Sequence, residues 1–236
     1  MHDVVVTFPR PQALVFDVMG TVVDLNGSIR DTTARVLAAR GTPAELVEPM
    51  VGGSADRLDE AMRAVSAGER AWAGHRALRR AALRETADAL GLPPLSADEE
   101  DDLSDVVSRA DPWPDSPAGL ARLRGLSTVV ALSNADPVEL AGLSVHGGLA
   151  WHLALSTRPS QAFKPDPRAY RVALDALELD AGAVMMVAAH TWDLQGAAET
   201  GFRTAYVQRP DEGPPGADFE LVVDDLDELA DRLQGS

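Results

Sequence analysis

The stretch ALVFDVMGT, residues 13–21, is an apolar run that ends in a carboxylate, a glycine and a hydroxyl group. Continuous apolarity over four to six residues is typical of a strand that is buried on both faces, as in a parallel sheet. Asp17 stands inside this run, where an ionised side chain is costly unless a cation or hydrogen-bond donors accompany it. The stretch therefore predicts the first strand of a parallel sheet, with a stabilised carboxylate at its carboxyl end.

Five further short apolar runs follow along the chain, at residues 128–133, 151–156, 184–189, 203–207 and 219–223. Amphipathic helical patterns lie between the later runs, for example at residues 170–177. Asp136-Pro137 and Asp166-Pro167 are typical helix starts, because an acid caps a helix and proline fits its first position. This alternation predicts an α/β fold, a doubly wound parallel sheet of the Rossmann-like kind.

The first two strands are unusually far apart. About 110 residues separate them, whereas an ordinary βαβ unit needs about 30. The excess carries helical patterns and no convincing strand, and the prolines of DPWPDSP, residues 111–117, mark its end. We therefore predict a Rossmann-like core of residues 1–26 and 112–236, with an inserted all-helical cap domain of residues 27–111. The N-terminal tail of about a dozen residues has no predicted role.

Composition excludes several classes of protein. The 236 residues carry 21 Lys and Arg against 37 Asp and Glu, a net charge of −16 that repels nucleic acids and anionic lipid surfaces. The absence of cysteine excludes a disulfide scaffold, a thiol nucleophile and a cysteine-ligated metal. No apolar run approaches the ~20 residues that span a bilayer, and the N-terminus lacks a signal-peptide core. We expect a soluble, cytoplasmic protein that binds neither nucleic acid nor membrane.

Polar groups stand at the predicted carboxyl ends of four strands, where open α/β sheets bind their ligands. They are Asp17, Thr21, Ser133, Asn134, Lys164, His190 and Asp193. For each of these residues taken singly, a structural role such as capping the following helix would explain its presence. Because parallel strands bring their carboxyl ends to one edge, the set as a whole predicts an active site there.

The segments FDVMGT, LSN, KPDPRAY and VAAHTWDLQGA, in this order and spacing, resemble the four motifs of the haloacid dehalogenase superfamily. KPDPRAY and the Trp-Asp of HTWDLQGA look most like the type II (L-2-haloacid) dehalogenases. The resemblance spans the sheet domain, and the helical insert lies where that superfamily places its cap. It implies a hydrolase in which Asp17 is the nucleophile.

The activity implied by the resemblance is that of an (S)-2-haloacid dehalogenase acting on the α-carbon of small 2-substituted carboxylic acids. Asp17 attacks that carbon with inversion and forms an ester, which water then hydrolyses. By the same resemblance, Asp193 positions or deprotonates the water, Lys164 neutralises the surroundings of the nucleophile, and Thr21 hydrogen-bonds its carboxylate.

The resemblance also implies the substrate contacts. Ser133 and Asn134 hold the substrate carboxylate, Tyr170 lines the pocket beside Lys164, and Met19 and Trp192 belong to the pocket wall. It implies no metal and no cofactor. A small carboxylic acid is the expected partner, and a homodimer is expected on the resemblance alone.

Three positions depart from the dehalogenase pattern. Met19 replaces a frequent aromatic residue, and His190 replaces a common asparagine. His190 is either a donor to water or leaving group, or a satisfied histidine at a strand end. The cap has no Trp-Arg pair, which would fall near residues 54–55; Arg57 is either the nearest substitute for that arginine or a solvated helix residue.

Three alternatives stay open. A related carbon-centred hydrolase would use the Asp17 ester to open a strained ring or expel another non-halide group. A superfamily phosphatase needs a second aspartate two residues after the nucleophile; Met19 stands there, and a thioether neither donates a proton nor binds a hard cation. A non-catalytic small-molecule binder would have no use for the retained Asp17, Lys164 and Asp193.

Overall fold

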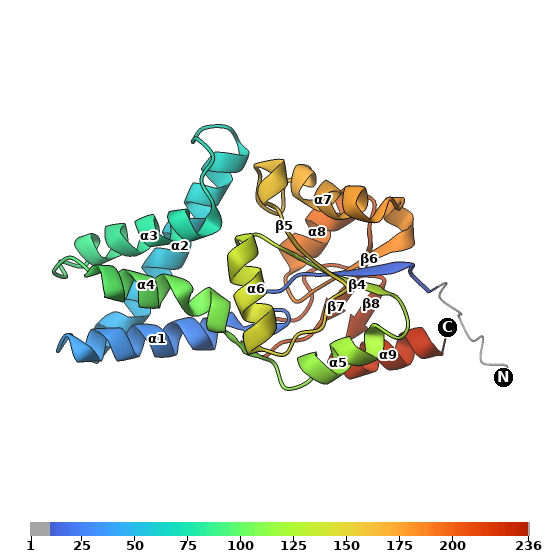
Figure 1. Ribbon diagram of the computed structural model, residues 1–236, viewed down its shortest axis with the longest axis horizontal. Coiled ribbons are helices and arrows are strands. Elements are labelled where there is room, and N and C mark those ends of the chain that lie inside the picture. Colours follow the sequence, from blue (N-terminus) through green and yellow to red (C-terminus); the bar gives the residue numbers. More distant parts are fainter. Residues whose placement is uncertain (1–9, 236) are drawn as a thin grey trace.

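The computed structural model describes residues 10–235, so the predicted N-terminal tail lies largely outside the described residues. Its centre is a six-stranded sheet in the order β5-β4-β1-β6-β7-β8, with every neighbouring pair parallel (Figure 1). The strands are β1 (Ala13–Phe16), β4 (Thr128–Ser133), β5 (Leu153–Ser156), β6 (Val184–Ala188), β7 (Arg203–Val207) and β8 (Leu221–Val223). This confirms the predicted doubly wound parallel sheet.

The strand order reverses direction between β1 and β6, because the chain fills one side of β1 first and then crosses to the other. A switch point of this kind opens a crevice at the carboxyl ends of the two strands. Phe16 of β1 is level with Val187 of β6, and the Asp17 N–H donates to the Val187 carbonyl at 3.0 Å. The residues after both strands therefore face one crevice.

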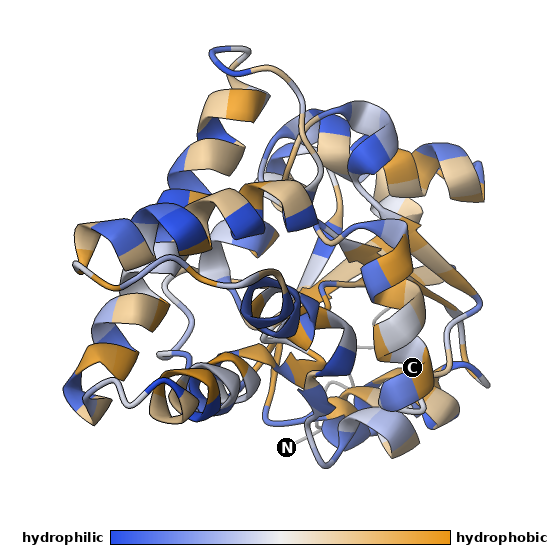
Figure 2. Ribbon diagram, turned by 60° about the vertical axis from the view of Figure 1, so that its left-hand side comes forward, coloured by the Kyte–Doolittle hydropathy of each residue, from blue (hydrophilic) through white to orange (hydrophobic). Residues whose placement is uncertain are grey.

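Side chains of β1 alternate between two cores, as the two-residue period of a strand requires. Leu14 and Phe16 pack with the helices on one face, and Ala13 and Val15 with those on the other. The first face carries α5 (Ser116–Leu123), α6 (Pro137–His146) and α9 (Leu226–Gln234); the second carries α7 (Pro167–Leu177) and α8 (Thr191–Glu199). Figure 2 shows the strands mainly in the hydrophobic colour, next to helices in which hydrophilic and hydrophobic residues alternate.

The insert after β1 contains α1 (Leu25–Ala39), α2 (Val47–Ser66), α3 (His75–Ala89) and α4 (Ala97–Asp105), which lie together at one end of the molecule (Figure 1). They share a separate apolar cluster that includes Met50, Leu83 and Leu103. The two-residue strands β2 (Val23–Asp24) and β3 (Asp111–Pro112) pair antiparallel where the insert begins and ends, a pairing that the sequence did not predict. The remaining elements are the 3₁₀ helices η1 (Ala44–Leu46), η2 (Val106–Arg109), η3 (Arg158–Ser160) and η4 (Ala181–Ala183).

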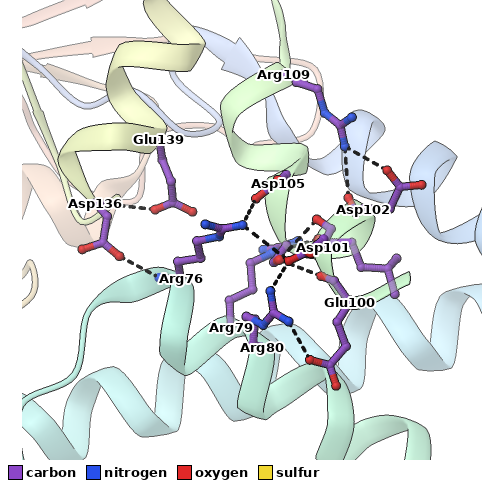
Figure 3. A network of polar contacts seen from close by, with 12 residues as sticks. Arg76, Arg79, Arg80, Glu100, Asp101, Asp102, Asp105, Arg109, Asp136 and Glu139 are labelled. Atoms are coloured by element: carbon purple, nitrogen blue, oxygen red, sulfur yellow. Dashed lines mark hydrogen bonds and ion pairs between the residues drawn. The ribbon is translucent and has the colours of Figure 1, made fainter. Parts of the chain in front are cut away.

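Polar contacts fix the cap helix α3 against the N-terminus of α6 (Figure 3). The Arg76 N–H donates to Asp136 Oδ2 at 3.1 Å, and its guanidinium pairs with Asp105 of α4. His75 Nδ1 lies 3.3 Å from Glu139 Oε2, which also accepts the Asp136 N–H. Asp136 and Glu139, which form the capping box of α6, therefore also contact the cap, and these contacts hold the cap over the sheet edge. No helix among residues 10–235 is long and apolar enough to cross a membrane.

Candidate active site

The Asp17 carboxylate is buried at the end of β1, with 4% of the residue exposed, and both its oxygens are contacted. Oδ1 accepts a hydrogen bond from Lys164 Nζ at 2.7 Å. Oδ2 accepts one from Thr21 Oγ1 at 2.7 Å and lies 3.0 Å from His190 Nδ1. Thr21 Oγ1 itself accepts the Ala189 N–H at 2.9 Å, which leaves its hydrogen free to point at Asp17. Three segments of chain therefore hold this carboxylate in one orientation.

These contacts decide the charge of Asp17. Burial opposes ionisation, but the ammonium group of Lys164 and the hydrogen bond and charge of His190 outweigh it and hold the pKa of Asp17 well below its ordinary value. Asp17 is thus an anion at neutral pH, which is the form that a carboxylate nucleophile needs.

Lys164 is a buried cation between two acids. Its Nζ donates to Asp17 and, at 2.6 Å, to Asp193 Oδ2. Burial favours the neutral amine, but the two carboxylates prevail and raise the pKa of Lys164. Asn134 fixes the segment that carries it, because Asn134 Oδ1 accepts the Lys164 N–H at 2.8 Å. One ammonium group therefore compensates two carboxylates.

Asp193 lies in the first turn of α8 and is fully buried. Besides Lys164 it contacts Tyr170, whose hydroxyl donates to Asp193 Oδ1 at 2.6 Å. Burial and the nearby charge of Asp17 raise the pKa of Asp193, although Lys164 and Tyr170 oppose the shift. A carboxylate with a raised pKa is a stronger base than an ordinary one, which suits it to accept a proton from water.

His190 is a cation that contacts a second acid. Its Nε2 lies 3.3 Å from Glu212 Oε1, and its ring stacks on Trp192 with centroids 5.5 Å apart. Burial favours neutral imidazole, but the hydrogen bonds and charges of Asp17 and Glu212 raise the pKa of His190 from 6.5 to about 10. The sequence does not indicate a role for Glu212. The stretch that contains it, DEGPPGAD, is rich in turn-forming residues and has no hydrophobic periodicity that would place Glu212 near His190.

A cavity of about 870 Å³ lies between the cap and this edge of the sheet, within the range of small-molecule sites. Its core wall includes Asp17, Met19, Asn134, Lys164, His190 and Trp192. Its cap wall is apolar along much of α1 and α2, through Leu25, Ile29, Val51, Leu58 and Met62. Charged or titratable cap side chains complete it, namely Asp59, Arg63, His75 and Arg79. The site thus combines a buried cluster of charged residues on the core side with a mostly apolar wall on the cap side.

Three residues that were expected in the pocket lie outside its wall. Ser133 is fully buried and its Oγ accepts the Ala135 N–H at 3.2 Å, so it caps the chain after β4. Tyr170 is also fully buried and acts on the cavity only through Asp193. Arg57 donates to the Gly53 carbonyl of its own helix at 3.0 Å.

Asn134 does line the cavity, but its amide contacts the Lys164 backbone through both Oδ1 and Nδ2. Its position therefore supports a role in fixing Lys164. The cavity-facing arginines are Arg63 and Arg79, which the sequence analysis did not select. Arg63 could have been found from helical spacing, since it continues the face that begins at residues 54–55 through Leu58 and Asp59.

Comparison with known proteins places the chain beside one group of enzymes. The family model for haloacid dehalogenase-like hydrolases matches residues 11–201. The (S)-2-haloacid dehalogenase of Xanthobacter autotrophicus is 30% identical over 84% of this chain and 75% of its own length. That of Pseudomonas sp. (strain YL) is 38% identical, but the match spans 54% of this chain and only 56% of the relative.

Solved structures agree with the sequence matches. The crystal structure of a defluorinating L-2-haloacid dehalogenase superposes with a TM-score of 0.89 at 29% identity, covering 97% of this chain and all of that one. The L-2-haloacid dehalogenase from Xanthobacter autotrophicus superposes with a TM-score of 0.82 at 25% identity, over 95% and 99% of the two chains.

Proposed function

The chain belongs to the haloacid dehalogenase-like hydrolases, and on that premise we propose that it is an (S)-2-haloacid dehalogenase working through an ester of Asp17. One observation carries the proposal. A buried carboxylate that remains ionised faces a cavity, and a second carboxylate with a raised pKa shares its lysine. The first is suited to attack carbon, and the second to activate water.

In the first step a carboxylate oxygen of Asp17 attacks the α-carbon from the side opposite the halide. A carbon–oxygen bond forms, the carbon–halogen bond breaks, and the halide leaves with the electron pair and without a proton. The configuration at that carbon inverts, so an (S)-2-haloacid gives an (R)-2-hydroxy acid. The two arginines of the cavity wall, Arg63 and Arg79, attract the anionic substrate into a protein of net charge −16.

The second step follows from the loss of charge on Asp17. In the ester, Asp17 no longer repels a negative charge on Asp193, and Lys164 alone keeps Asp193 ionised, while burial remains the cause that makes Asp193 a stronger base than an exposed carboxylate. Water attacks the ester carbonyl carbon while Asp193 accepts its proton. The bond between that carbon and the oxygen now carried by the substrate then breaks, and the hydroxy acid leaves with a proton from Asp193. Asp17 keeps the water oxygen and the second water proton, and it releases that proton to solvent to become a carboxylate again, because its pKa is low.

This chemistry is tested by halide release from (S)-2-chloropropionate and (S)-2-bromopropionate without added metal. We expect release of one halide for each hydroxy acid formed. Folded protein that releases none would leave the ring-opening hydrolase, the phosphatase and the binder as the remaining functions. Met19 weighs against the phosphatase, because a thioether lines the cavity where that class places its acid.

The resemblance implies a cap arginine, in a Trp-Arg pair that this chain lacks, in contact with the leaving halide; Arg63 is the candidate for that contact. It faces the cavity, where the charge of Asp59 lies near it, and its guanidinium makes no hydrogen bond with any described residue. We expect Arg63→Gln to lower kcat/KM for 2-chloropropionate about tenfold, the equivalent of one charge-assisted hydrogen bond. Arg70→Gln, which removes an exposed cap arginine outside the cavity, is the matched control. A larger loss in Arg57→Gln than in Arg63→Gln would contradict the assignment.

Two further properties remain predictions. The homodimer rests on the resemblance alone, and light scattering of the purified protein tests it. A cytoplasmic location rests on composition alone, and fractionation of the source cells tests it.

A further inference from the structure

His190 connects two carboxylates that come from different parts of the chain. Asp17 follows β1, His190 follows β6, and Glu212 lies in the loop 208–220 between β7 and β8. The imidazole lies 3.0 Å from Asp17 Oδ2 through Nδ1 and 3.3 Å from Glu212 Oε1 through Nε2. The two-step scheme above gives neither His190 nor Glu212 a specific task.

The donors around Asp17 distinguish its two oxygens. A carboxylate oxygen has two lone-pair directions. At Oδ2 both are occupied, by the Thr21 hydroxyl and by His190, whereas Oδ1 has one donor, Lys164. Oδ1 therefore keeps a lone pair for attack on carbon, and Oδ2 becomes the carbonyl oxygen of the ester.

We propose that Thr21 and His190 form the oxyanion hole for hydrolysis of the Asp17 ester, and that Glu212 is a positioning residue that keeps His190 charged and directed at Oδ2. The inference rests on the proposed dehalogenase function. When water adds to the ester carbon, the carbonyl electron pair moves onto Oδ2, and the water proton goes to Asp193. Donors that already contact Oδ2 stabilise the negative charge there without reorganising. When the carbonyl forms again, the bond from that carbon to Oδ1 breaks, and Oδ1 leaves with the product.

The same geometry separates this role from proton donation to the leaving group. Attack by Oδ1 places the departing group on the far side of the reacting carbon. His190 contacts Oδ2 on the near side, so it is not placed to protonate that group. The histidine thus serves the second half-reaction.

Glu212 matters most in the ester, because Asp17 then carries no charge and Glu212 is the carboxylate still in contact with the imidazole. Two further charged groups lie near His190. Asp59, on cap helix α2, interacts with it by charge, and Lys164 binds the opposite oxygen of Asp17. In the free enzyme Asp17 and Glu212 together raise the pKa of His190. Removal of Glu212 therefore has a direct effect on the charge of the oxyanion donor.

Residues before and after Glu212 in the chain make hydrogen bonds that hold this loop in place. Arg209 donates to the Thr21 carbonyl at 2.7 Å, and the Tyr206 hydroxyl donates to the Gly213 carbonyl at 2.6 Å. The Gly216 N–H donates to Thr191 Oγ1 at 3.1 Å, next to His190 in the chain. These contacts fix the loop against the residues around the site and place Glu212 beside His190.

The test compares Glu212→Gln with Asp211→Asn, which removes the same charge from the neighbouring exposed position. Rapid quench with (S)-2-bromopropionate follows halide release, and intact-protein mass follows the ester. We expect Glu212→Gln to release a first equivalent of halide at nearly the wild-type rate. The ester then accumulates, and kcat falls about 10- to 100-fold, less than complete loss of an oxyanion donor. The alkaline limb of kcat moves to lower pH, because an imidazolium that loses its anion deprotonates sooner.

A double-mutant cycle shows whether Glu212 acts through His190. In a His190→Asn background, which keeps a neutral donor, Glu212→Gln is expected to change kcat less than twofold. The inference is overturned if Glu212→Gln slows the halide burst as much as ester hydrolysis, if the alkaline limb stays in place, or if its effect persists in His190→Asn. Wild-type protein that releases no halide would instead refute the proposed function, and the inference with it.

Discussion

Asp17→Asn is expected to reduce halide release from (S)-2-chloropropionate by at least about 10⁴-fold, because removal of a covalent nucleophile leaves only binding and electrostatics to act on the substrate. An amide is a poor nucleophile and forms no ester that Asp193 and water could hydrolyse. The amide keeps the shape of the carboxylate, and Lys164 keeps Asp193 as its counter-ion. The variant should therefore fold, and its circular dichroism should match that of the wild type.

Asp56→Asn is the matched control for this prediction. Asp56 is exposed on the same cap helix as Arg63 and lies outside the cavity wall. Its turnover should stay within about twofold of wild type, as is usual for a surface substitution. An Asp17→Asn enzyme that retains a rate within tenfold of wild type would show that the carbon is attacked by another group.

Lys164→Gln is expected to cost both activity and stability. The variant leaves two carboxylates buried together without a cation, and breaking a buried ion pair commonly costs about 3–5 kcal/mol. One of the two acids then takes up a proton at neutral pH, so either the nucleophile or the base is lost, and turnover should fall about 10³-fold. Urea unfolding and halide release measure the two effects.

The destabilisation by Lys164→Gln should depend on pH with a definite sign. In the wild type the pKa of Asp17 is lowered, so its contribution to stability is present above its ordinary pKa near 3.8 and is lost as pH falls below that. In the variant both carboxyl groups lose the positive charge of Lys164, so the pKa of Asp193, already raised in the wild type, rises further and that of Asp17 also rises. The folded variant then binds more protons than the unfolded chain and loses stability as pH rises. The difference in free energy of unfolding between the wild type and Lys164→Gln should therefore increase from about pH 4 to neutrality.

A second variant keeps this prediction testable if Lys164→Gln does not fold. Lys164→Gln combined with Asp193→Asn leaves a single buried carboxylate, so most of the lost stability should return while turnover stays low. Equal stability and equal turnover in Lys164→Gln and wild type at pH 7 would show that the lysine is dispensable to the cluster.

Sequence patterns predicted the sheet and the group of residues at its edge for a physical reason. Buried parallel strands are short apolar runs, and parallel strands bring their carboxyl ends to one side. The structure accordingly brings Asp17, Lys164, Asp193 and His190 into one cluster. The position of a residue in a motif predicts that it lies near the site, but it does not predict which way its side chain points. Ser133 ends a strand at the same edge, yet its hydroxyl caps the backbone.

The cap and the loop were less predictable. Arg57 and Arg63 lie on one helix. Helical spacing places Arg63 on the face of residues 54–55, but only the packing of that helix against the core shows that this face lines the cavity. Glu212 reaches His190 through a loop whose path depends on distant contacts, such as that of Arg209 with Thr21. Hydrophobic periodicity carries no information about the path of such a loop. The contact between Glu212 and His190 therefore could not be predicted from the sequence.

The most direct test of the Asp17 ester is a single turnover of (S)-2-chloropropionate by excess enzyme in water enriched in ¹⁸O. Hydrolysis at the ester carbonyl puts the water oxygen into the Asp17 side chain, and the product takes its new oxygen from Asp17. We therefore predict ¹⁸O in the peptide that contains Asp17 and none in the hydroxyl group of the first equivalent of product. Labelled product beside an unlabelled Asp17 peptide would mean that water attacks the substrate carbon directly, and the covalent account would be wrong.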